Sequence, residues 1–80
     1  MRVVAEIPHE AVKITIFAWN GKYLIKLEKG PYEQTYKISD MEVSGDEAIK
    51  QMLDDIFLEE ALNLFQQMHG NLMATLERTE

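Results

Sequence analysis

The stretch "KITIFAWNGKYLIKLEK", from Lys13 to Lys29, decides the fold expected of this chain. Apolar and polar residues alternate on both sides of Asn20-Gly21, which is the pattern of two half-buried strands. Asn-Gly is the dipeptide whose residues tolerate the positive φ angles of a type I′ turn, so the two strands are expected to form a tight hairpin. Because a two-residue turn fixes the pairing, the sequence also predicts which side chains share a face.

The predicted pairing gives this hairpin one apolar face and one face that is only partly polar. The inner face, which we expect to be the core, carries the opposed pairs Ala18–Tyr23, Ile16–Ile25 and Ile14–Leu27. The outer face carries Lys13–Glu28, Thr15–Lys26, Phe17–Leu24 and Trp19–Lys22. The first two outer pairs are ordinary solvated pairs, whereas the last two place aromatic rings on the wet side of the sheet.

Two further strands and a helix are predicted around the hairpin. The segments expected to form strands are residues 2–7, 11–19, 22–29 and 33–39, with breaks at Pro8, at Asn20-Gly21 and at Gly30-Pro31. After them, "SGDE" predicts a capping box in which Ser44 is the N-cap and Glu47 the third helical residue. The sequence therefore predicts an α+β domain spanning residues 1–80, with a four-stranded antiparallel meander at about 2–39 and a long C-terminal helix at about 45–78.

The apolar stripe of the C-terminal segment changes phase, which leaves two arrangements open. Ile49, Met52, Leu53 and Ile56 share one helical face, and a later set lies on a face rotated by roughly 150°. Either the chain turns between Asp54 and Leu58 to make two helices, or one long helix packs its first half on the sheet and its second half on a partner. We favour the single helix, because no Gly or Pro interrupts residues 46–69. The later stripe, predicted to form a homodimer interface, is Leu58, Ala61, Phe65, Met68, Leu72 and Leu76.

Size and composition also favour a partner. A core from 80 residues is small, and such chains commonly gain stability from a disulfide, a metal or a second subunit. The chain has no cysteine, which removes disulfides and thiolate metal sites, so a partner chain is the expected supplement. Its net charge of −6 lies entirely in residues 45–80, since residues 1–44 hold six basic and six acidic side chains. No apolar run is long enough to span a membrane and no signal peptide is present, so the protein is expected in the cytoplasm.

Catalytic and metal-binding chemistry finds little support in the residues. Ser39 and Ser44 are the only serines, no cysteine is present, and no phosphate-binding glycine pattern occurs. His9 and His69 are interpreted as satisfied or exposed histidines. The best metal candidate is an acidic set interpreted instead as a solvated face of the helix, and it consists of Asp54, Asp55, Glu59 and Glu60. We therefore expect no enzyme activity, no bound metal and no cofactor.

The outer sheet face is the predicted binding site. Proteins that bind single-stranded nucleic acid use cationic side chains to contact the phosphates and exposed aromatic rings to stack on the bases. The residues predicted to contact nucleic acid or another partner are Lys13, Phe17, Trp19, Lys22, Leu24, Lys26 and Lys37, with Thr15 and Thr35 beside them. Alternatively, Phe17, Trp19 and Leu24 form a small cross-strand cluster, or are covered by a loop, the N-terminus or a second subunit.

The predicted β-β-β-β-α order, with a sheet face for ligand and a helix for pairing, resembles the Whirly, Pur-repeat and transcriptional positive-coactivator group of single-stranded nucleic-acid binders. In motif, only "ITIFAWNGKYLIKLE" looks like the Pur pattern of an aromatic-bearing strand, a tight turn and a second strand. The resemblance implies ligand contact through Phe17, Trp19, Lys22 and Lys26 and dimerisation through the helix. The acidic balance and the scarcity of arginine depart from that group.

The expected function is therefore that of a non-catalytic homodimeric module that binds single-stranded DNA or RNA on its sheet face. The alternative is a protein-interaction or assembly domain in which the Trp19 surface and the acidic helix meet protein partners.

Overall fold

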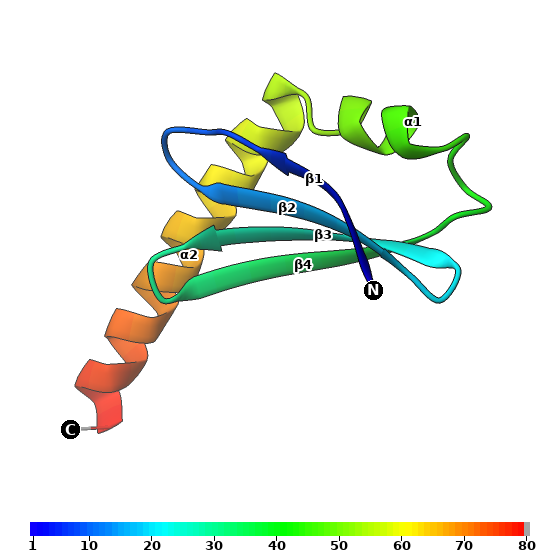
Figure 1. The fold of residues 1–80 in the computed structure, drawn as a ribbon. Helices are drawn as coiled ribbons and strands as arrows, with labels where there is room; N and C mark the ends of the chain where they lie inside the picture. The colour runs from blue at the N-terminus through cyan, green and yellow to red at the C-terminus, as the bar shows by residue number, and fades with distance from the viewer. Residues whose placement is uncertain (80) are drawn as a thin grey trace.

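The computed structural model describes residues 1–79, which form one antiparallel sheet and two helices (Figure 1). The sheet has the order β1-β2-β3-β4, so each strand pairs with its neighbour in the chain. The α+β meander followed by a long C-terminal helix is thereby confirmed. The elements are β1 Arg2–Ile7, β2 Lys13–Trp19, β3 Lys22–Lys29, β4 Tyr32–Ser39, α1 Asp46–Gln51 and α2 Asp55–Thr79.

The hairpin of β2 and β3 has the predicted turn and register. Asn20 has a φ of 57° and Gly21 a φ of 78°, as a type I′ turn requires at both central residues. All seven predicted cross-strand pairs are formed, from Lys13 with Glu28 to Trp19 with Lys22. The strand bounds differ slightly from the prediction, because β2 begins at Lys13 and β4 begins at Tyr32.

The core lies between the inner face of the sheet and the two helices. Phe65 of α2 and Ile49 of α1 are fully buried against the sheet residues. Two polar contacts hold α2 along β4: the Gln34 amide donates to the carbonyl of Ala61 at 2.9 Å, and the Tyr32 hydroxyl lies 2.7 Å from Nδ1 of His69. The buried set is Val12, Ile14, Ile16, Tyr23, Ile25, Leu27, Ile49, Ala61 and Phe65.

The C-terminal segment is two helices rather than the single helix that we favoured. The break lies at residues 52–54, where Asp54 acts as the N-terminal cap of α2: its carboxylate accepts from the backbone N–H of Phe57 at 2.8 Å. This turn resolves the phase change, because Ile49 and Phe65 both point into the same core only if the chain changes direction between them. A favourable capping residue therefore begins the second helix, and the break contains no glycine or proline.

The predicted capping box at the start of α1 is wrong. The N-cap residue is Gly45, with a φ of 144°, and no side chain caps the helix. Asp46 begins the helix, but its carboxylate is directed to the sheet rather than to the helix backbone.

The molecule is elongated, with a radius of gyration of 14.6 Å and extents of 47 × 25 × 18 Å. A compact domain of this length has a radius of gyration of about 11.6 Å. The difference comes from the C-terminal turns of α2, which run past the turn between β3 and β4 (Figure 1). Neither helix in residues 1–79 combines the length and the apolar character that a bilayer crossing requires.

Candidate functional site: the outer face of the sheet

Both helices lie on one side of the sheet, so no element within residues 1–79 covers the other side (Figure 1). Trp19 is half exposed on that open side, at 50% of its full area, and Phe17 and Leu24 beside it are partly exposed. The rings on the wet face are therefore neither packed under the helices nor covered by the N-terminus.

The outer face consists of cross-strand rows of different character. One row is apolar and ends in a cation, with Val3 opposite Phe17, Phe17 opposite Leu24, and Leu24 opposite Lys37. The row nearest the β2–β3 turn joins Trp19 with Lys22 and Lys22 with Ser39. We call these two rows the Trp19 patch: Val3, Phe17, Trp19, Lys22, Leu24, Lys37 and Ser39.

The rows at the opposite end of the face are polar and of mixed charge. They carry Glu6, Thr15, Lys26 and Thr35 in one row and Lys13, Glu28 and Glu33 in the next. Lys26 lies 3.6 Å from a carboxylate oxygen of Glu33 and 4.0 Å from one of Glu28. Two predicted contact residues, Lys13 and Lys26, thus share their end of the face with three glutamates.

Charge is therefore segregated along the face. The Trp19 patch contains two lysines, Lys22 and Lys37, and no acidic residue. Neither lysine makes an ion pair within the part of the chain that the structure describes. The structure places five of the seven predicted contact residues in the patch, whereas Lys26 lies in the adjoining row and Lys13 one row farther, both on the part of the face that carries glutamates.

Val3 is a member of the patch that the sequence reasoning missed. It is 56% exposed and extends the apolar row to β1, the edge strand of the sheet within the described residues. The β1–β2 register contains a bulge between Val3 and Ala5, and the connection between the two strands is not a tight turn. For these reasons the face of Val3 does not follow from the alternation in "RVVAEI".

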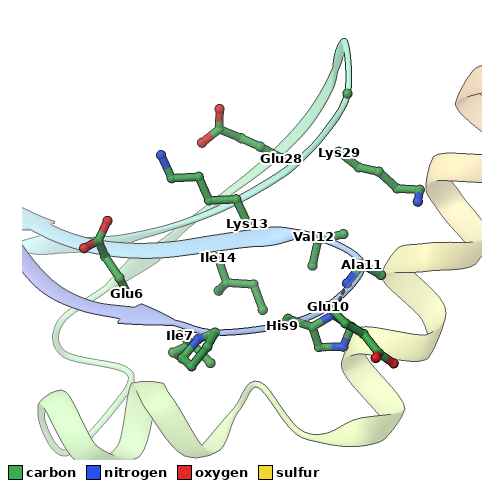
Figure 2. Close-up of a pocket in the computed structure, with 12 residues that line it drawn as sticks. Glu6, Ile7, His9, Glu10, Ala11, Val12, Lys13, Ile14, Glu28 and Lys29 are labelled. Carbon is green, nitrogen blue, oxygen red and sulfur yellow. Dashed lines mark hydrogen bonds between the residues drawn. The ribbon is translucent and has the colours of Figure 1, made fainter.

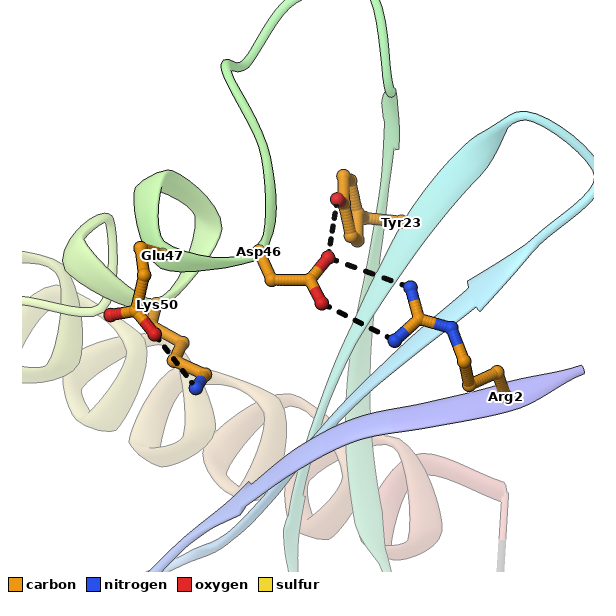
Figure 3. Close-up of polar contacts among 5 residues, drawn as sticks. All are labelled: Arg2, Tyr23, Asp46, Glu47 and Lys50. Atoms are coloured by element: carbon orange, nitrogen blue, oxygen red, sulfur yellow. Dashed lines mark hydrogen bonds and ion pairs between the residues drawn. The ribbon is translucent and has the colours of Figure 1, made fainter.

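A polar cluster closes the inner side of the sheet behind the patch (Figure 3). The Tyr23 hydroxyl donates to the Asp46 carboxylate at 2.7 Å, and the guanidinium of Arg2 lies 3.2 Å from the same carboxylate. The hydrogen bonds from Tyr23 and Arg2 hold the pKa of Asp46 below its ordinary value, and the bond to Asp46 raises the pKa of Tyr23. These contacts fasten α1 to the inner side of the sheet.

A hollow of about 600 Å³ lies beside the β1–β2 connection (Figure 2). Lys13 and Glu28 point to one side of the sheet in Figure 2, and His9 and Glu10 lie away from them at the connection. Nδ1 of His9 accepts a hydrogen bond from the backbone N–H of Ala11 at 3.0 Å, so this histidine shapes the loop. Among residues 1–79, no group of three or more His, Asp or Glu side chains is placed to hold a metal ion.

The structure places some of the predicted dimer residues in the core and leaves others exposed. Ala61 and Phe65 belong to the core of their own chain, which corrects their assignment to a dimer surface. Leu58 and Met68 are partly buried against the same core. Leu72 and Leu76 are exposed, at 40% and 47%. The later stripe therefore faces the chain's own sheet first and leaves it only near its end.

Comparison of this chain with protein families, with curated proteins and with solved structures gave no match.

Proposed function

We propose that this protein is a non-catalytic binding module that holds a short stretch of single-stranded nucleic acid on the Trp19 patch. The proposal rests on the open patch itself, where an indole ring and two lysines lie on two rows that carry no carboxylate within residues 1–79. Exposed rings stack on bases of any sequence, and ammonium groups neutralise the phosphates beside them.

The dimensions of the patch suit a few nucleotides. Phe17 and Trp19 are two residues apart on one strand, so their rings are about 7 Å apart along β2. Lys22 lies on the adjacent strand and Lys37 one strand farther, about 5 and 10 Å from β2 across the sheet. Bases stacked on β2 would therefore have their backbone over β3 and β4, within reach of both ammonium groups.

A second candidate function is recognition of an extended protein segment, and it is favoured by the apolar row. The apolar row of Leu24, Phe17 and Val3 crosses the sheet and ends on β1. The outer edge of β1 is unpaired within residues 1–79. An added strand could pair with that edge and place side chains over the apolar row. Such binding would rest on apolar burial and backbone hydrogen bonds, so its affinity would depend little on salt.

Trp19 is the only tryptophan, so its fluorescence reports directly on the patch. The test is a titration of the protein with a short oligothymidylate at low salt. We expect saturable quenching of Trp19 emission that added salt reverses. Emission that does not respond at low salt would refute nucleic-acid binding at this face. Lys29→Gln is the matched control, because Lys29 is an exposed sheet lysine on the opposite face.

A further inference from the structure

The distal end of α2 is an apolar surface that the other elements within residues 1–79 leave exposed. The sheet supports the helix from Phe57, which packs edge-to-face on Tyr36, as far as His69, which contacts Tyr32. Beyond that point the apolar stripe continues, and Leu72 and Leu76 are exposed. At a rise of 1.5 Å per residue, residues 70–79 project roughly 15 Å past the last sheet contact.

The accessible surface area of the chain is larger than that of a compact monomer of the same mass, and the excess is close to the area that one subunit buries in a stable complex. The accessible surface is 5679 Å². A compact monomer of 9.3 kDa exposes about 5000 Å². The excess of about 700 Å² is close to the roughly 800 Å² that each partner buries in a stable complex.

The charges on α2 indicate that a second copy can occupy this surface. Residues 61–76 contain no Asp, Glu, Lys or Arg, although most of their positions on the helix are exposed. Depletion of charge is typical of the centre of an interface. Because the chain carries a net charge of −6, two copies repel each other over much of their surface. They can approach closely where the helix is neutral.

From these observations we propose that two copies pair through the distal halves of α2, antiparallel, about a two-fold axis near Leu72. The ridge of Met68, Leu72 and Leu76 has a four-residue repeat and is complementary to itself in this orientation, with Leu72 meeting Leu72 and Met68 meeting Leu76. The antiparallel direction holds Glu59 and Glu60 of the two copies about 30 Å or more apart, whereas a parallel pair would place these acids side by side.

A hollow at the start of the projecting segment can accept a leucine side chain of the second copy. It measures about 510 Å³ and lies between the β3–β4 turn and α2, lined by Pro31, Tyr32, Met68, Asn71, Leu72 and Thr75. In the proposed pair, Leu76 of each copy enters the hollow of the other. The outer sheet face lies on the far side of the sheet from α2, so pairing leaves the Trp19 patch open and does not depend on it.

Light scattering after size-exclusion chromatography tests the pairing. We expect a mass of about twice 9.3 kDa for the natural sequence, and a monomer for Leu72→Asp and for Leu76→Asp. Burying two unpaired carboxylates should raise the dimer dissociation constant about 100-fold or more. Ile56→Asp is the matched control, because Ile56 is an exposed aliphatic residue of α2 outside the neutral segment, and this variant should remain a dimer.

Cross-linking tests the position of the two-fold axis without adding a charge. The chain has no cysteine, so Leu72→Cys gives a single thiol that a short thiol-reactive cross-linker can join only between copies. We expect efficient cross-linking at position 72 and none with Ile56→Cys. A monomeric natural protein, a dimer that survives both aspartate substitutions, or equal cross-linking at positions 56 and 72 would overturn the proposal.

Discussion

The salt dependence of binding provides a quantitative prediction for the Trp19 patch. If Lys22 and Lys37 each neutralise one phosphate, the slope of log affinity against log salt for a single strand is about −1.4. Affinity should then fall about 7-fold between roughly 50 mM and 200 mM salt. A larger slope would require contacts from cations outside the patch, because these two are the only cations on its rows.

Substitutions in the patch should distinguish the contribution of the indole ring to binding from that of the two lysines. Trp19→Ala removes one stacking platform and should weaken binding by about 1–3 kcal/mol while the salt slope stays unchanged. Lys37→Gln should reduce the slope to about −0.7. Lys29→Gln, on the inner side of the sheet, should change neither quantity.

Fluorescence anisotropy of a labelled oligonucleotide, measured for each variant at several salt concentrations, provides both the affinity and the slope. Binding at the Trp19 patch is refuted if Lys29→Gln lowers the slope as much as Lys37→Gln, since affinity would then depend on overall charge rather than on this face. It is also refuted if Trp19→Ala binds as tightly as the natural sequence.

Two further predictions concern the packing that positions the patch. Phe65→Ala should lower the free energy of unfolding by about 3–5 kcal/mol in urea denaturation, because this buried ring holds α2 on the sheet. Ile56→Ala, at an exposed position, should lower it by less than about 0.5 kcal/mol. Equal losses of stability in the two variants would contradict the core described above. Because the pKa of Asp46 is lowered in the folded state, its stabilising contribution is present above about pH 4 and is lost as pH falls through the folded-state value. In thermal unfolding, the stability difference between the natural sequence and Asp46→Asn should narrow on acidification below about pH 4, and a constant difference would show that the cluster does not titrate as described.

The parts of the fold that local chemistry determines were predictable from the sequence. Asn20-Gly21 admits one tight turn, and that turn fixes every pair of the β2–β3 hairpin, so the faces of Phe17 and Trp19 followed. The β1–β2 pairing contains a bulge, which alternation does not reveal, and Val3 was missed for that reason.

The errors in the helical segment have a common physical cause. Residues such as Ser44 and Asp54 have similar capping propensity, and the choice between them depends on tertiary contacts. Tyr23 and Arg2 engage Asp46 at the start of α1, and Ile49 and Phe65 must both reach the core. Periodicity revealed the change of phase but did not indicate which surface each stripe would meet. Ala61 and Phe65 pack against the sheet of their own chain and not, as the stripe predicted, against a partner subunit.

Amide chemical-shift mapping tests most directly whether the outer sheet face near Trp19 is the binding surface. Isotope-labelled protein would be titrated with a short oligothymidylate at low salt and its spectra followed by NMR. We expect saturable shifts at the indole N–H of Trp19 and at the backbone amides of Phe17, Leu24 and Lys37, with α2 unchanged. Shifts confined to α2, or no shifts at all, would contradict binding at this face.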